Sequence, residues 1–109
     1  MAVLHINALD QLTALLSTEK VIVIDFFATW CGPSRSISPY FEELAGQYNN
    51  IKFVKVDVDQ AEEICVNYKV RSMPTFVLVK DGIEQKRFSG ADRNALKQMV
   101  ETAHHHHHH

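Results

Sequence analysis

Hydrophobic residues recur along this chain with two different periods, and the alternation of the two predicts its elements. Residues 21–28, "VIVIDFFA", are almost all apolar and rich in β-branched side chains. A short run of this kind is typical of a central strand buried on both faces. From residue 8 to 16, apolar residues recur every three or four positions, as on one face of a helix. The runs 75–80 and 83–89 flank Asp81-Gly82 and predict a β-hairpin.

The remaining segments complete a predicted order of β-α-β-α-β-α-β-β-α. Strands that alternate with helices are parallel and joined by helical crossovers, and the hairpin adds an antiparallel pair. The order therefore predicts an α/β domain in which helices cover both faces of a mixed sheet. The further strands are expected at 3–6 and 51–59, and the further helices at 34–48, at 59–68 with Asp59 as its cap, and at 92–101.

Composition places the chain among ordinary globular domains. Its 109 residues are 46% hydrophobic and 22% charged, which fits one domain. The net charge of -2 gives no reason to expect nucleic acid or an anionic membrane as a partner. No apolar run approaches the ~20 residues that span a bilayer, and the first residues do not resemble a secretion signal. We therefore expect a cytoplasmic protein.

The six histidines at 104–109 have the form of an expression tag, so the predicted domain covers residues 1–103. The tag is left out of any argument about metals. The chain has only two cysteines, Cys31 and Cys65, too few for a disulfide scaffold or a four-ligand zinc site. No metal site is expected.

Cys31 is the first candidate for chemistry, because it lies between the buried strand and the start of a helix. Free amide N–H groups and the helix dipole favour an anion there, and the thiolate is the form of cysteine that attacks disulfides. Trp30 beside it is typical of a contact surface. Cys65 shares helical spacing with Ile64 and Tyr68, so we expect a small buried side chain there.

Asp25 is the second candidate, because it interrupts an otherwise apolar strand. Burying an ionised carboxylate costs several kcal/mol, so we expect its pKa to rise. The alternative is a carboxylate near a strand end that reaches water.

Four separate stretches together resemble thioredoxin, and the likeness runs along residues 1–103. They are "DFFATWCGP" from Asp25, "FVKVDVD" from Phe53, "PTF" after Met73 and "FSGA" from Phe88. The resemblance implies the thioredoxin fold, a five-stranded mixed sheet in the order 1-3-2-4-5 with four helices. It also implies reduction of protein disulfides, no bound cofactor, and electrons from NADPH through thioredoxin reductase.

The resemblance also assigns roles to single residues. Cys31 is the nucleophile, and Asp25 lies behind the second cysteine position and assists its proton transfers. Lys55 is the lysine near that Asp, and its alternative is a solvated strand lysine. Pro74 faces the nucleophile, and the Met73 backbone pairs with an extended substrate segment. The catalytic loop further includes Gly32, Pro33 and Ser34, and the substrate groove is bordered by Trp30, Val58, Gly90 and Ala91.

The departure from the family is Ser34, which stands where the family has its second cysteine. A serine hydroxyl cannot form a disulfide, so we expect attack by Cys31 to proceed and release of the substrate to fail. Mixed disulfides with substrate proteins should then accumulate, as should a Cys31–Cys31 dimer without reductant. The tag and the otherwise intact loop favour an engineered substitution over a natural one-cysteine protein.

Two other functions stay open on the sequence. One is a glutathione-dependent enzyme with a single active-site cysteine, similar to glutaredoxin, although Trp30 and Pro33 argue against it. The other is a binding module on the same scaffold without redox activity, since a fold alone does not fix a function.

Overall fold

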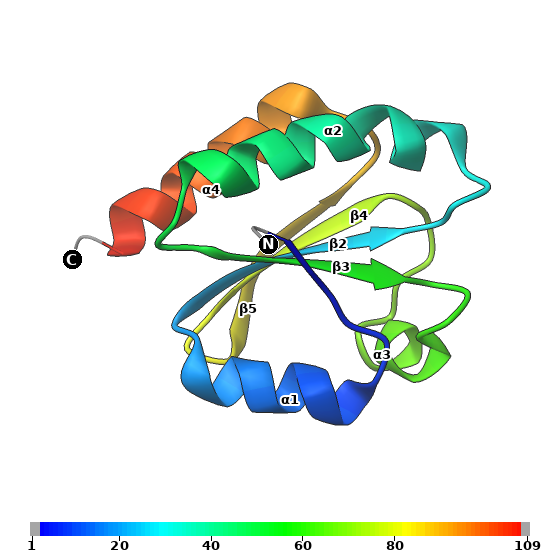
Figure 1. The fold of residues 1–109 in the computed structure, drawn as a ribbon, viewed down its shortest axis with the longest axis horizontal. Helices are drawn as coiled ribbons and strands as arrows, with labels where there is room; N and C mark the ends of the chain where they lie inside the picture. Colours follow the sequence, from blue (N-terminus) through cyan, green and yellow to red (C-terminus); the bar gives the residue numbers. More distant parts are fainter. Residues whose placement is uncertain (1–2, 108–109) are drawn as a thin grey trace.

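The five strands form one mixed sheet (Figure 1). From one edge of the sheet to the other, they lie in the order first, third, second, fourth and fifth, counted along the chain. The computed structural model describes residues 3–107. The described residues do not include 1 and 2, which begin the predicted domain, or 108 and 109, which end the tag. The predicted α/β class and the thioredoxin strand order are confirmed.

The centre of the sheet is β2, Val21–Phe27, and its first six residues are buried. It lies between β3, Lys52–Asp57, which runs parallel to it, and β4, Thr75–Lys80, which runs antiparallel. A strand with neighbours on both edges and helices on both faces excludes water from every side. This is the environment that the apolar run predicted.

The two edge strands are shorter or more polar. At one edge, β1, Val3–His5, runs parallel to β3. At the other, β5, Ile83–Ser89, pairs antiparallel with β4 through the predicted hairpin. Asp81 and Gly82 adopt φ angles of 51° and 79°. Positive φ at both central residues is the conformation that a tight hairpin turn requires, and it explains this residue pair.

The helices cover the two faces of the sheet in pairs (Figure 1). Above the sheet in that view lie α2, Gly32–Gln47, and α4, Arg93–His107. Below it lie α1, Leu9–Thr18, and α3, Glu62–Asn67.

Two apolar cores result, one on each face. Under α2 and α4, the ring of Phe41 lies 5.3 Å from that of Phe53 and 5.9 Å from that of Phe76. Against α1 and α3, the core includes Leu12 and Ile64. The strand β2 contributes to both cores, because successive side chains point to opposite faces. Val21 and Val23 enter the first core, and Ile22, Ile24 and Phe26 enter the second.

Three predicted helix boundaries are wrong. The helix α2 begins at Gly32, not at residue 34, because Pro33 fits a first helical turn, where no N–H is needed. The helix α4 continues to His107, past the expected end at 101. No helix-breaking residue stands there, and the ring of His104 lies 5.2 Å from that of Tyr48.

The third error concerns α3. It begins at Glu62 with Ala61 as its N-cap, and no side chain caps it. Asp59 is not the cap, because its carboxylate accepts a hydrogen bond from the indole of Trp30 instead.

We predict that Phe41→Ala destabilises the domain by about 3–5 kcal/mol, because the cavity it leaves lies among two other packed rings. Ile83 is a matched control, since 64% of it is exposed, and Ile83→Ala should change the free energy of unfolding by less than about 0.5 kcal/mol. Urea unfolding curves measure both. Equal effects of the two substitutions would contradict this description of the core.

Candidate active site

Cys31 is fixed at the junction of β2 and α2. Its N–H donates to the carbonyl of Ala28 at 3.2 Å, and its own carbonyl accepts from the N–H of Arg35 at 3.1 Å. It is the N-cap of α2, with an extended backbone and no side-chain cap bond. The half-buried thiol therefore lies beside the unpaired N–H groups of a helix start, where an anion is favoured.

The loop before β4 faces this thiol. The thiol of Cys31 donates to the carbonyl oxygen of Met73 at 3.4 Å, although the two residues are 42 positions apart. The Met73–Pro74 peptide bond is cis, and Pro74 is buried. Its carbonyl accepts from the N–H of Gly90 at 2.9 Å. Gly90 has φ 102°, a conformation that favours glycine. Three of the predicted segments thus meet at one place.

The other predicted groove residues are exposed or half-buried. Trp30 is 62% exposed, and its indole N–H donates to Asp59 Oδ2 at 2.8 Å. Val58 is half-buried, and its N–H donates to the carbonyl of Phe27 at 3.0 Å. On the side of α4, Ala91 is exposed. Gly32 and Pro33 form the exposed first turn of α2.

Ser34 points inward from the first turn of α2 and is only 2% exposed. Its hydroxyl accepts a hydrogen bond from the N–H of Ala28 at 3.3 Å. The side chain thus joins the helix to the end of β2. It occupies a buried position one helical turn from Cys31, on the same helix start.

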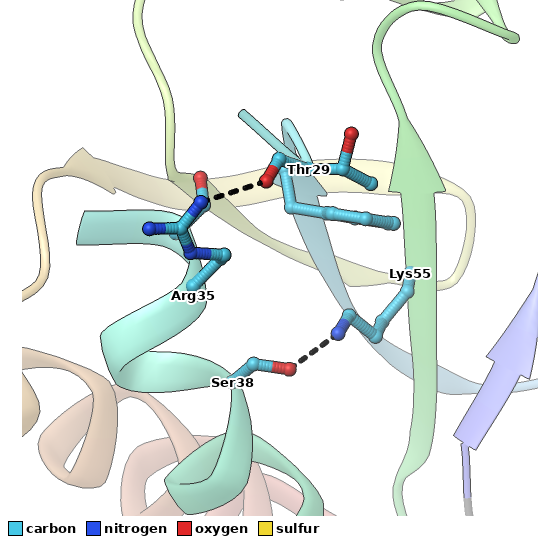
Figure 2. Close-up of a pocket in the computed structure, with 6 residues that line it drawn as sticks. Thr29, Arg35, Ser38 and Lys55 are labelled. Carbon is cyan, nitrogen blue, oxygen red and sulfur yellow. Dashed lines mark hydrogen bonds between the residues drawn. The ribbon is translucent and has the colours of Figure 1, made fainter. Parts of the chain in front are cut away.

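A cavity of about 150 Å³ adjoins Ser34, and Figure 2 shows its polar residues. Lys55 enters from β3 and donates to the hydroxyl of Ser38 on α2. The guanidinium of Arg35 turns back to the carbonyl of Thr29, at 3.3 Å. Lys55 is only 7% exposed, and its ammonium lies 4.5 Å from the centre of the Phe27 ring. It is a buried cation, not a solvated one.

Asp25 is completely buried, and neither carboxylate oxygen has a hydrogen-bond partner among the described residues. It is the register partner of Lys55 across β2 and β3. Burial raises the pKa of this carboxyl to about 7, and the charge of Lys55 opposes part of that rise. The expectation of a buried acid with a raised pKa is confirmed, and the alternative of a carboxylate that reaches water is wrong.

Cys65 belongs to a different environment. It is half-buried on α3 and packs against the core that contains Ile64. Burial raises the pKa of its thiol, and the carboxylates of Asp57, Asp59 and Glu62 raise it further. Its expected packing with the core is present, although the side chain is less buried than predicted.

Some contacts of the site were not predicted. The sequence did not indicate that Ser38 pairs with Lys55 or that Asp59 pairs with Trp30. Ser38 follows Ser34 by four positions, so both lie on one face of the helix. This spacing could have indicated that Ser38 faces the site. No sequence pattern indicated the contact between Trp30 and Asp59.

Comparison with known proteins now gives the family. The thioredoxin family model matches residues 3–102. The chain belongs to the thioredoxin family.

Individual thioredoxins are similar over nearly the whole chain. Thioredoxin of Coprinus comatus is 48% identical over 98 residues, which cover 88% of this chain and 92% of that protein. Thioredoxin of Mycoplasmoides gallisepticum is 45% identical, over 89% and 98% of the two chains. The X-ray structure of Fasciola hepatica thioredoxin superposes with a TM-score of 0.88 at 43% identity, over 92% of this chain and 98% of that one.

Thioredoxins are oxidoreductases, and the half-buried Cys31 thiol of this chain follows the central strand of the sheet. Within the part of the chain that the structure describes, no three metal-ligating side chains come together. No helix among the same residues is long and apolar enough to cross a membrane.

We predict that Asp25→Asn stabilises the fold, and by more near pH 8 than near pH 4. The carboxyl binds its proton more tightly in the folded state than in the unfolded state, where its pKa is about 3.9. The buried carboxyl therefore does not reduce the free energy of unfolding below that pH. The reduction grows from there to about pH 7, and above pH 7 it is on the order of 4 kcal/mol. Asparagine removes this cost.

Urea midpoints at the two pH values measure the effect. The exposed Asp10 offers the control Asp10→Asn, which should show no comparable rise with pH. A gain from Asp25→Asn that is the same at both pH values would contradict a buried, proton-binding Asp25.

We also predict that iodoacetamide alkylates Cys31 about tenfold or more faster than Cys65 near neutral pH, because only a thiolate reacts. Cys31 lies at the start of α2, whereas burial and three carboxylates raise the pKa of the Cys65 thiol and so disfavour its thiolate. Peptide mass spectrometry measures both rates in one sample. The difference should vanish in denaturant, and equal rates in the folded protein would refute the assignment.

Proposed function

We propose that this chain performs the first half of protein-disulfide reduction and retains its substrate as a mixed disulfide. The observation that carries the proposal is the position of the Cys31 thiol. It lies at a helix start, 3.4 Å from the backbone carbonyl oxygen of Met73. Such a position activates the sulfur and leaves room for an extended substrate segment beside Met73.

The first step needs no group beyond Cys31 and the substrate. The Cys31 thiolate attacks one sulfur of the substrate disulfide. A bond forms between Sγ and that sulfur, the substrate S–S bond breaks, and its electron pair leaves with the second sulfur as a thiolate. Cys31 is oxidised to a mixed disulfide, and one substrate thiol is produced.

The second step requires another thiol in the same site, and Ser34 does not provide one. A tethered thiol reacts at an effective concentration of up to ~10⁵–10⁸ M in favourable cases, far above any free thiol. The buried Ser34 hydroxyl occupies the expected place but forms no disulfide. The mixed disulfide therefore persists until an external thiol reaches it.

The buried charges beneath the loop complete the proposed machinery. Asp25, with its pKa of about 7, can exchange a proton around neutral pH. The charge of Lys55 on the neighbouring strand lowers the pKa of Asp25 and so opposes part of the rise caused by burial. In a form with cysteine at position 34, this pair would serve the proton transfers of the resolving thiol. Gly32 and Pro33 would shape the helix start.

The family determines the partners that we propose. The substrates are disulfide-containing proteins that bind between Trp30, Val58, Gly90 and Ala91. A form with cysteine at position 34 would be returned to the dithiol state by thioredoxin reductase, with electrons from NADPH. We place the protein in the cytoplasm, and without reductant we expect a Cys31–Cys31 dimer.

We predict that Ser34→Cys converts the chain into a multiple-turnover enzyme, because it restores the tethered thiol in a nearly isosteric position. In an insulin reduction assay with dithiothreitol, it should turn over at least about 100-fold faster than the Ser34 form. On non-reducing gels, the Ser34 form should instead accumulate mixed disulfides. Cys31→Ser is the control and should give neither result.

Three outcomes would refute the proposal. Turnover by the Ser34 form as fast as by Ser34→Cys would show that resolution needs no second cysteine. Absence of any mixed disulfide would show that Cys31 is not a nucleophile and would favour a binding module. Efficient reduction of glutathione mixed disulfides by the Ser34 form would favour the enzyme similar to glutaredoxin.

A further inference from the structure

Three arginines lie on the segments that build the site, and none of them has a carboxylate partner among the described residues. Arg35, Arg71 and Arg93 are exposed. The fourth arginine of the chain, Arg87, pairs with Glu84 at 2.6 Å, which is the one ion pair among the described residues. From this contrast we propose that the groove selects disulfides flanked by acidic residues, which contact these three guanidinium groups. The inference rests on the proposed function and adds the class of substrate.

Each arginine belongs to a segment that builds the site. Arg35 lies in the first turns of α2, where its N–H binds the Cys31 carbonyl. Its guanidinium is held over the active-site loop by the carbonyl of Thr29 (Figure 2). A positive charge thus has a fixed place one helical turn from the nucleophile.

Arg93 begins α4, three residues after Gly90. Its guanidinium stacks over the ring of Tyr40 on α2, 4.1 Å from the ring centre. The nearest acidic residue in sequence, Asp92, accepts a hydrogen bond from the N–H of Ala95 and so caps the helix. The guanidinium is therefore oriented by an aromatic face that leaves its edge free for a carboxylate.

Arg71 lies on the loop that faces Cys31, two residues before Met73. The Met73 carbonyl contacts the Cys31 thiol, so a substrate strand that pairs with this loop passes close to Arg71. No hydrogen bond or ion pair of its side chain occurs among the described residues.

The segment bound to Trp30, at the end of β3 and the start of α3, carries the opposite charge, and we call it the acidic wall. Asp57, Asp59 and Glu62 lie together at the end of β3 and the start of α3, close enough to raise the pKa of the Cys65 thiol. Asp59 is bound to the indole of Trp30, so one of these charges is partly satisfied. This wall repels acidic side chains. An acidic segment is thus expected to lie toward α2 and α4, which also orients it.

The whole chain has a net charge of -2, so the positive charge of the three arginines is a local feature of the site. A local field of one sign at a binding groove raises association rates for the opposite charge by ~10–10³-fold, and salt screens the effect. The selectivity should therefore reside in the rate of mixed-disulfide formation and should depend on ionic strength.

The experiment uses the Ser34 chain itself with short peptides whose single cysteine is joined to thionitrobenzoate. Attack by Cys31 on the peptide sulfur forms the mixed disulfide and releases the coloured thionitrobenzoate anion. Three peptides differ only in whether glutamate, serine or lysine flanks the cysteine. We expect the glutamate peptide to react about tenfold faster than the lysine peptide at low salt, and the two rates to converge near 1 M salt, where the Debye length is ~3 Å.

Charge reversal tests the arginines directly. Arg71→Glu combined with Arg93→Glu should abolish or invert the ratio between the rates of the glutamate and lysine peptides. Arg35 stays unchanged because it binds the active-site loop. Lys20 precedes β2 at the opposite end from Cys31 and is exposed, so Lys20→Glu is the matched control and should preserve the ratio.

The outcomes separate the two claims. If none of the peptides reacts, the proposed function is wrong and this inference fails with it. If the peptides react but at equal rates, or if the double reversal leaves the ratio unchanged, the selectivity is refuted while the proposed function stands.

Discussion

The site depends on the way in which β2 ends. This strand is buried on both faces, and Ala28, the first residue after it, uses both of its backbone groups to hold the next turn. Its carbonyl accepts from the N–H of Cys31, and its N–H donates to the hydroxyl of Ser34. Cys31 is therefore attached directly to the end of the buried central strand, while its side chain stays half-buried.

The same buried strand carries the Asp25 carboxyl, whose ionised form lowers the stability of the fold. Asp25 is fully buried without a hydrogen-bond partner, beside the Lys55 chain on the next strand. An unpaired buried acid lowers stability above neutral pH, so packing alone does not explain its presence. Asp25 is the register partner of Lys55, which lines the cavity beside Ser34, and this position is the basis of the role in proton transfer that we propose.

The sequence predicted most of the fold, because its strongest signals are local. The apolar run at 21–28 and the Asp81-Gly82 turn each imply one backbone conformation, and both predictions are confirmed. Two of the three wrong helix boundaries, at Asp59 and near His104, depend on partners distant in sequence. The same holds for the contact of Cys31 with Met73, which only the resemblance indicated and no periodicity could show.

The stoichiometry of thiol release tests the central claim most directly. The reduced chain is mixed with an excess of a linear peptide disulfide without any other thiol, and the released thiols are counted. One attack by Cys31 with no resolution predicts one thiol per chain, with the other half of the peptide bound to Cys31 by mass spectrometry. Release of two thiols per chain, with no bound peptide, would contradict the claim that Ser34 stops the reaction after its first step.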